Sequence, residues 1–420
     1  MVSLKKFFPV LASIVLINLS FASSGLDAKV MSASNLDKFV SALNNDVETY
    51  LKKELKRDTV GFKVTALGVC ADISECKIIK FTIPDYIERE TVFSLTIYLD
   101  NKKMNISGRV LDTKEREIVE LAARKNFPEY KVENTISTFP FNIKKPYGVV
   151  VKPFANLYVK PGDKDLATQL LMGTPVRILE YSKDEKFARI QSDDDKYIAW
   201  IPRNTISELD EVSWNKWKSS RNIVIINDIK KPENIHFGTI LPEIQKSKDD
   251  SKIKLLLPDG KNIIISSSDV EDLIKIKSDI TRLINNANRF LVEGEKGKTK
   301  YVWGGTVGKE LDCSGFNQTI FRSEGLFLPR DADQQQHFTK PVAADISKID
   351  ELKPGDLLFF SEKREYATHT GIYIGNYKFI HSSSGGKYRG IKISTLKGGD
   401  EYDKKLQKMY FGGGHLEFNN

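Results

Sequence analysis

The stretch Asp312-Cys313-Ser314-Gly315-Phe316 decides how the last part of this chain folds. Asp312 has the short acceptor side chain that caps a helix, because it can bond a free N–H of the first turn. Phe316, Ile320 and Phe321 then fall on one helical face. The spacing therefore predicts a helix that begins beside Cys313 and holds its thiol in the first turn.

This position favours a reactive Cys313. The N–H groups of a first helical turn lack partners within the helix, and the helix dipole is positive there, so both favour a thiolate. The thiolate is the nucleophilic form of cysteine. The same N–H groups can donate to the oxyanion that forms when sulfur attacks a carbonyl carbon. We predict that Cys313 is a catalytic nucleophile.

Two histidines follow on predicted strands. A strand is expected at 357–360, His369 begins the next apolar run at 369–374, and His381 ends the run 377–381. Adjacent antiparallel strands would place the two imidazoles side by side at one sheet edge. A nucleophile, a base and an orienting residue are the parts of a cysteine hydrolase, so we predict an enzyme with Cys313, His369 and His381 in these roles.

A zinc site is the alternative for the same three side chains, since one cysteine and two histidines can bind zinc with one position open. No carboxylate or second cysteine stands nearby at ligand spacing. We therefore predict no metal and no cofactor. His236, His337 and His415 have no motif around them and are expected to be structural or on the surface.

The first 24 residues have the pattern of a secretory signal peptide. A basic start with Lys5 and Lys6 precedes an apolar run at 7–21 and the small residues 22–24. The run is too short for an ordinary spanning helix, although an uncleaved anchor is the alternative. We predict export to the periplasm, the cell wall or the medium, with no stable membrane span after cleavage.

Export changes the interpretation of the three cysteines, because disulfides persist outside the cytosol. Cys70 and Cys76 flank a short polar segment between two β-rich runs, 62–69 and 77–83, so we predict that they form a disulfide. This pairing would leave Cys313 as the odd, free thiol.

With 420 residues, of which 40% are hydrophobic and 29% charged, the chain is long enough for several folded domains. The formal net charge of +8 suits a protein that works beside anionic polymers. The lysines are spread along the chain, which a solvated surface also explains. Export argues against a nucleic-acid partner.

The organisation along the chain predicts an α+β protein. Residues 25–140 carry helical spacing at 35–55 and 113–125 and a strand at 92–99, which indicates an α+β domain of unknown role. Residues 145–207 hold short strands between turns and resemble a bacterial SH3-like barrel. Residues 215–270 resemble a second, divergent copy. A helical connection over 269–290 is expected to lead into the last domain, 275–420.

The last domain resembles the NlpC/p60 family of cell-wall cysteine peptidases, which have a papain-like fold. The resemblance rests on an ordered set of short motifs. These are Tyr301-Val302-Trp303-Gly304-Gly305, Asp312 to Phe316, Leu328-Pro329-Arg330-Asp331, Pro354-Gly355-Asp356-Leu357, His369-Thr370-Gly371-Ile372-Tyr373 and Phe379-Ile380-His381. The resemblance implies cleavage of peptidoglycan stem peptides (muropeptides) at the bond from γ-D-glutamate to diaminopimelate or lysine.

SH3-like domains ahead of such a domain are typical of the subgroup that accepts stem peptides with a free N-terminal L-alanine. The resemblance then implies substrate-binding roles for Tyr301, Asp312, Ser314 and Tyr197, with Asp312 facing the ammonium and Tyr197 closing the pocket. Two other functions stay open. One is an amidase or acyltransferase acting on another cell-wall or lipid substrate, and the other is a non-catalytic wall-binding protein.

Overall fold

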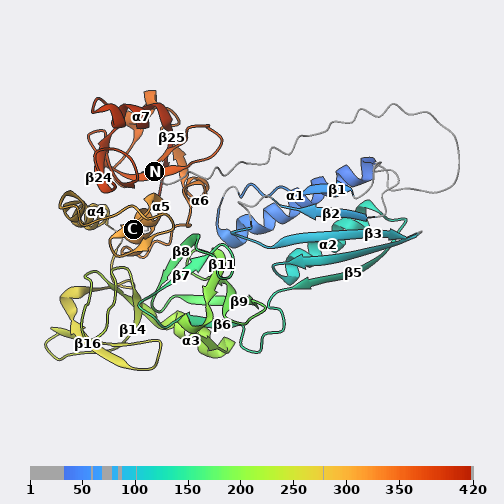
Figure 1. Cartoon of the computed structure of the whole chain (residues 1–420), viewed down its shortest axis with the longest axis horizontal. Helices are drawn as coiled ribbons and strands as arrows, with labels where there is room; N and C mark the ends of the chain where they lie inside the picture. Colours follow the sequence, from blue (N-terminus) through green and yellow to red (C-terminus); the bar gives the residue numbers. More distant parts are fainter. Residues whose placement is uncertain are drawn as a thin grey trace.

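The computed structural model describes residues 33–57, 60–68, 78–83, 88–100, 102–277 and 279–417. These residues form an N-terminal α+β domain, two β domains and a C-terminal α+β domain, coloured blue to teal, green to yellow, and gold to red in Figure 1. The α+β class agrees with the sequence prediction. The predicted signal peptide and the predicted Cys70–Cys76 disulfide lie outside the described residues.

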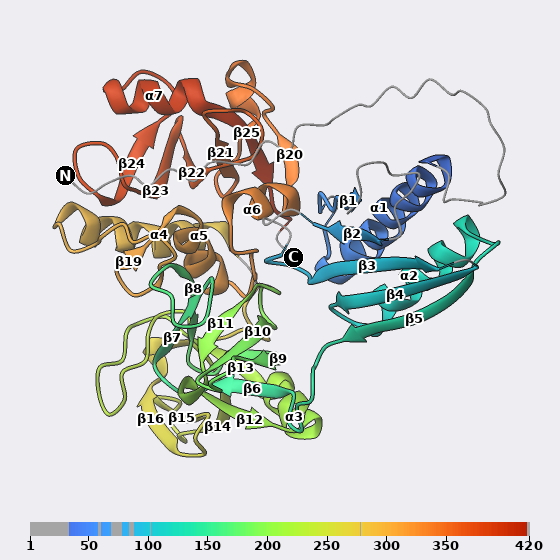
Figure 2. The same cartoon turned by 45° about the vertical axis from the view of Figure 1, so that its right-hand side comes forward.

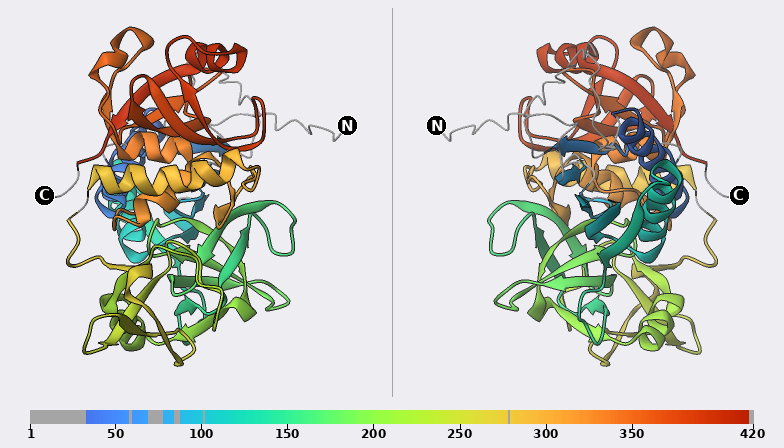
Figure 3. Two further views of the ribbon diagram at one scale, coloured as in Figure 1. Left: turned by 90° about the vertical axis from the view of Figure 1, so that its left-hand side faces the viewer. Right: turned by 90° about the vertical axis from the view of Figure 1, so that its right-hand side faces the viewer.

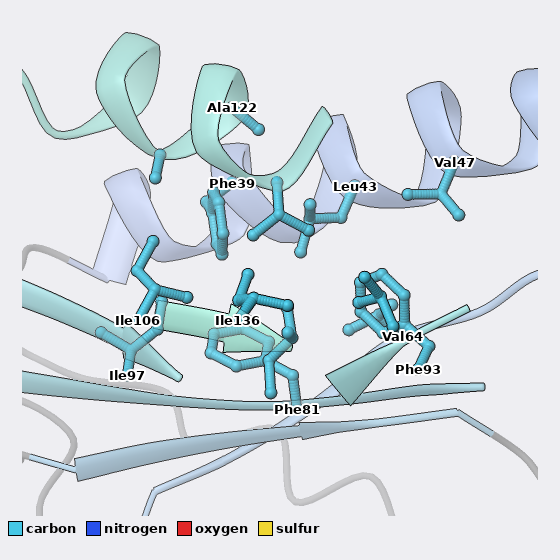
Figure 4. Close-up of a cluster of buried hydrophobic side chains, with 14 of the residues drawn as sticks. Phe39, Leu43, Val47, Val64, Phe81, Phe93, Ile97, Ile106, Ala122 and Ile136 are labelled. Atoms are coloured by element: carbon cyan, nitrogen blue, oxygen red, sulfur yellow. The ribbon is translucent and has the colours of Figure 1, made fainter. Parts of the chain in front are cut away.

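The N-terminal domain packs two helices on a five-stranded sheet (Figure 4). α1 (Ala33–Leu55) and α2 (Thr113–Asn126) occupy the stretches where helical periodicity predicted them. They bury Phe39 and Leu43 against sheet residues such as Phe81. The strands in sheet order are β1 (Thr65–Gly68), β2 (Ile78–Thr82), β3 (Phe93–Asp100), β4 (Lys103–Val110) and β5 (Lys131–Thr138). Because β4 and β5 run parallel, α2 is the crossover between them.

A seven-stranded antiparallel sheet follows over residues 147–209. Its strands alternate buried and partly exposed positions, and Leu157, Ile190 and Ile201 belong to its core. The sheet order is β12-β6-β9-β10-β11-β7-β8. The strands are β6 (Tyr147–Val150), β7 (Phe154–Tyr158), β8 (Leu166–Leu171), β9 (Pro175–Tyr181), β10 (Phe187–Ser192), β11 (Ile198–Pro202) and β12 (Ile206–Leu209).

Helix α3 (Glu211–Ser220) leads to a separate five-stranded sheet with the order β16-β15-β14-β13-β17. Its strands are β13 (Arg221–Ile225), β14 (Ile240–Lys246), β15 (Lys252–Leu256), β16 (Asn262–Ser266) and β17 (Val270–Asp272). The prediction of a helix from residue 269 was wrong in its first part. Val270 pairs with Ile225 as a strand, and the helix begins only after Asp279, which accepts from the Thr281 N–H at 2.8 Å.

The C-terminal domain packs helices on both faces of a six-stranded sheet with the order β20-β25-β21-β22-β23-β24. The helices are α4 (Ile280–Glu295), α5 (Cys313–Arg322), α6 (Ala332–Phe338) and α7 (Glu401–Met409). The sheet strands are β20 (Lys340–Val342), β21 (Leu357–Phe360), β22 (His369–Gly375), β23 (Lys378–Ser383), β24 (Gly390–Thr395) and β25 (Tyr410–His415). A short hairpin of β18 (Thr306–Val307) and β19 (Glu310–Leu311) precedes α5.

Strand β21 shows why this sheet is covered on both sides. Leu357 and Phe359 pack with α4 and α5, whereas Leu358 and Phe360 pack in a second cluster with Leu406 of α7. All four side chains are buried. The helix that begins at Cys313 is thereby pressed onto the sheet that carries both histidines.

The domains contact one another extensively. The N-terminal domain lies beside α6, and the two β domains lie below the C-terminal domain in the views of Figures 2 and 3. Val92, Leu111 and Phe139 form one buried apolar cluster with Leu179 and Ile198 of the first β domain. None of the described helices is both long and apolar enough to span a membrane.

Candidate active site

The start of α5 fixes the position of Cys313. Asp312 caps the helix, as predicted, by accepting a hydrogen bond from the Gly315 N–H at 2.7 Å. The Asp312 N–H donates to the carbonyl of Gly305 at 3.0 Å, which brings the segment 301–305 against the helix start. A Cβ at Gly315 would lie 2.1 Å from the oxygen of Gly305. Glycine at 315 is therefore required for this close approach.

The two histidines form a hydrogen-bonded pair. Nε2 of His369 lies 2.7 Å from Nδ1 of His381, and Nε2 of His381 lies 3.2 Å from the hydroxyl of Ser394. The strands β22 and β23 are neighbours, as predicted, but both are interior strands, so the pair does not lie at a sheet edge. His381 is fully buried.

The helix start and the first histidine strand are joined directly. Nδ2 of Asn317 in α5 donates to the hydroxyl of Thr370 in β22 at 3.0 Å. The backbone N–H of Thr370, the residue after His369, acts on the Cys313 thiol and lowers its pKa. Because Nε2 of His369 is engaged by His381, Nδ1 is the ring nitrogen that remains for exchange of a proton.

That proton exchange requires one arrangement of ring hydrogens. If Nδ1 of His369 accepts the proton, its Nε2 carries hydrogen and donates to Nδ1 of His381. His381 then carries hydrogen on Nε2 and donates to Ser394. The observed contacts match this series of hydrogen bonds, so His381 and Ser394 together fix the orientation of the His369 ring.

Burial dominates the electrostatics of the site. It raises the pKa of the Cys313 thiol to about 12, and the charge of Asp312 adds to this, while N–H groups of Thr370 and Ser314 act in the opposite direction. The first-turn N–H of Ser314 favours a thiolate, as predicted, but burial outweighs this effect and keeps the pKa of the thiol high.

The histidines are neutral for the same reason. Burial lowers the pKa of His369 to about 4, and the nearby ammonium of Lys392 contributes. Burial also holds the pKa of His381 well below its ordinary value, with further contributions from His369 and Lys392. At neutral pH these shifts favour a thiol at Cys313 and neutral imidazoles at His369 and His381.

Arg330 organises the residues on either side of Cys313. Its Nη2 donates to Oδ2 of Asp312 at 2.6 Å, and its Nη1 donates to Oδ1 of Asp312 at 3.2 Å and to the hydroxyl of Ser314 at 2.9 Å. Its Nε donates to the hydroxyl of Thr168 in the first β domain at 2.9 Å. The fully buried guanidinium thus joins the β domain to the nucleophile's helix.

Comparison with known proteins identifies two of the domains. Residues 297–409 match the NlpC/P60 family. The C-terminal domain is an NlpC/P60 domain. Residues 157–206 match the bacterial dipeptidyl-peptidase Sh3 domain, so the first β domain is of that SH3-like kind. The resemblance and the fold predicted from the sequence motifs are thereby confirmed.

Several relatives share parts of the chain. It is 33% identical over 169 residues to a gamma-D-glutamyl-L-lysine dipeptidyl-peptidase of Bacillus subtilis, covering 40% of this chain and 52% of the relative. It is 28% identical over 237 residues to a Bacillus cereus protein of the same name, covering 52% and 67%. A murein DD-endopeptidase/LD-carboxypeptidase of Escherichia coli is 39% identical over 107 residues, covering 25% and 51%. The chain thus spans about half to two thirds of the length of these relatives.

A solved NlpC/P60 family protein from Bacillus cereus has a similar fold, with a TM-score of 0.51 and 22% identity. The similarity covers 64% of this chain and 99% of that protein. About two thirds of this chain therefore shares a known fold.

The predicted substrate-binding residues occupy different parts of this architecture. Tyr301 is half-buried near Cys313 and Asp312, whose charges add to burial in raising the pKa of its phenol. Asp312 and Ser314 are bonded to Arg330. Tyr197 is buried in the SH3-like domain, and the pKa of its phenol is raised by burial and then by Asp331. Their contacts with substrate stay predictions.

Sequence reasoning missed several residues of the NlpC/P60 domain. Arg330 stood in a recognised motif, yet its bonds to Asp312 and Ser314 required the folded chain. Gln335 of α6 donates to the carbonyls of Ser314 and Pro329, and no local pattern indicates this. Lys392 lies opposite His381 on β24 and is buried, which only strand pairing reveals.

Within the described ranges, no group of three or more His, Cys, Asp or Glu side chains is arranged so that it could hold a metal ion. Among these residues Cys313 is a free cysteine.

Proposed function

We propose that this chain is an exported cysteine peptidase that hydrolyses peptidoglycan stem peptides. The observation that supports the proposal most is the start of α5 at Cys313 together with the bonded pair of His369 and His381 on β22 and β23, the strands against which α5 packs. The names of the relatives support the substrate class, because they act on γ-D-glutamyl-L-lysine or murein bonds.

The proposed chemistry starts from a neutral Cys313 thiol and a neutral His369 imidazole. His369 Nδ1 takes the proton of the Cys313 thiol while sulfur attacks the scissile carbonyl carbon, and first-turn N–H groups of α5 stabilise the oxyanion. Collapse of this tetrahedral intermediate breaks the C–N bond and leaves a thioester on Cys313, and His369 gives its proton to the leaving amine. A water molecule, deprotonated by His369, then hydrolyses the thioester and frees the thiol.

For the bond, we propose the one that joins γ-D-glutamate to diaminopimelate or lysine, in a peptide whose L-alanine has a free amine. The SH3-like domain supports this choice, since it matches a domain described as that of bacterial dipeptidyl-peptidases, and the B. subtilis and B. cereus relatives are named gamma-D-glutamyl-L-lysine dipeptidyl-peptidases. Tyr301, Tyr197, Asp312 and Ser314 are the proposed substrate contacts. Because Arg330 already pairs with Asp312, we expect Asp312 to act on the ammonium together with this arginine.

Mass spectrometry of digests tests the proposal. The full chain and its Cys313→Ala variant are incubated with diaminopimelate-containing and lysine-containing muropeptides, with and without an acetylated N-terminus. We expect the wild type to release L-Ala-γ-D-Glu from the free peptides and the variant to release none.

Other products would assign another function. Cleavage between D-alanine and diaminopimelate would indicate the murein endopeptidase type of bond, and release of acyl groups from lipid substrates would indicate an acyltransferase. Equal activity of the Cys313→Ala variant would refute Cys313 as nucleophile. Equal rates on free and acetylated peptides would refute recognition of the amine.

A further inference from the structure

The N-terminal domain lies outside the residues that match the two families, yet it contacts Asp331, the residue next to Arg330. Its residues Arg89 and Glu90 meet the start of α6, which Figures 1 and 2 show beside the N-terminal sheet. The Arg89 guanidinium is ion-paired with Asp331 and, at 3.0 Å, with Asp333. Asp331 directly follows Arg330 and caps α6.

We propose that Arg89 is a positioning residue of the active site. It holds the segment 328–333 in place, and thereby also Arg330, whose bonds to Asp312 and Ser314 fix the start of α5. The proposal rests on the proposed function for its catalytic consequence. It assigns the N-terminal domain a role as a permanent part of the catalytic unit.

Permanent docking is supported by buried contacts on both sides of Arg89. Glu90 is ion-paired with Arg57 and accepts from the side chain of Gln334 in α6, and the side chains of Glu90 and Arg57 are each only 3% exposed. The Arg89 carbonyl accepts from the Ile198 N–H at 2.8 Å, next to Tyr197. A contact meant to open would not bury charged groups so completely, since separating them would leave charges unpaired.

The contacts continue from Arg89 to the nucleophile. The turn that Arg89 holds begins α6, and Gln335 of α6 donates to the carbonyl of Ser314 at 3.0 Å and accepts from Asn317 at 3.1 Å. Arg330 bonds Asp312 and Ser314 from the same turn. Loss of the Arg89 pairs would leave Asp331 and Asp333 as adjacent unpaired carboxylates, and their repulsion would displace this turn.

Variants of the full chain test the proposal by two readouts. We compare Arg89→Ala and Arg89→Lys with the control Arg109→Ala, which removes another pair between the N-terminal and SH3-like domains. Arg109 bonds Glu180 at 3.0 Å, and its side chain is 50% exposed, so its loss should be nearly neutral. The readouts are kcat and KM on muropeptides, and the rate at which iodoacetamide alkylates Cys313, measured on its peptide by mass spectrometry.

We expect Arg89→Ala to raise KM by about tenfold or more, since small misplacements of a site have effects of this size. Alkylation of Cys313 should become several-fold faster, because the packing around the start of α5 loosens. Arg89→Lys should restore part of both the KM and the alkylation rate, and Arg109→Ala should match the wild type. Should Arg89→Ala not fold, Asp333→Asn removes one pair and should show the same directions.

Wild-type values for Arg89→Ala in both readouts would overturn the proposal. Higher activity than wild type would also overturn it, because the contact would then be inhibitory. The alkylation readout needs no substrate, so it tests the role of Arg89 even if muropeptides prove not to be cleaved.

Discussion

Replacement of Arg330 by methionine should strongly destabilise the NlpC/P60 domain. Methionine keeps the apolar stem but removes four hydrogen bonds, of which two go to Asp312 and one each to Ser314 and Thr168. Removing one partner of a buried ion pair costs about 3–5 kcal/mol. Asp312 would keep the N–H groups of Gly304 and Gly315 at 2.9 and 2.7 Å, so we expect the lower end, about 3 kcal/mol.

A double-mutant cycle separates the pair from the lost packing. Asp312→Asn still caps α5, because asparagine is an equally good cap, but it leaves Arg330 charged and without its counterion. The double variant Arg330→Met with Asp312→Asn removes both charges. Its destabilisation should fall below the sum of the single effects by about 1–3 kcal/mol.

Urea unfolding followed by hydrogen–deuterium exchange of the peptide that carries α5 measures these free energies in the relevant domain. Arg124→Met is the control, since Arg124 forms an exposed pair with Glu120 one turn away, for which about 0.2–0.5 kcal/mol is expected. Additive single effects, or a loss below about 1 kcal/mol for Arg330→Met, would refute the view that Arg330 is the electrostatic centre of the site.

Two further predictions concern pH. Burial raises the pKa of Glu115 to about 8, so its contribution to folding is greatest below its ordinary pKa of 4.5 and is lost as pH rises toward 8. The free energy of unfolding of Glu115→Gln, measured in urea, should therefore rise by about a few kcal/mol relative to that of the wild type between pH 5 and pH 8. A difference between the two proteins that does not change with pH would contradict this. Lys392 is the second cause, after burial, of the low pKa of His369, so Lys392→Met should raise that pKa toward its ordinary value and move the acid limb of the kcat/KM profile to higher pH. The exposed control Lys397→Met should leave this limb in place. If the limb does not move in Lys392→Met, burial alone sets the pKa of His369.

Local patterns predicted those parts of the fold that depend on neighbouring residues. The helices at 33–55 and 113–126 and the helix that begins at Cys313 appear where apolar spacing and capping residues predicted them. The strand Val270–Asp272 was mistaken for helix because its partner β13 lies about 45 residues earlier in the chain, and such pairing leaves little local signal.

The charge state of the nucleophile shows a second limit. The helix start was correct, and its dipole does favour a thiolate, but the pKa depends on how much water reaches the sulfur. Burial beneath the packed helix and sheet raises the pKa of Cys313, and no feature of the residues around position 313 reveals that burial.

The sequence by itself determined the helix that begins at Cys313, the order of the motifs and the strands that carry His369 and His381, because helix caps and strand periodicity act over a few residues. Only the tertiary structure decided the bonding of the two imidazoles, the four bonds of Arg330 and the approach of Arg89 to Asp331. These contacts join residues that are 12 to 242 positions apart, and packing of whole domains brings them together.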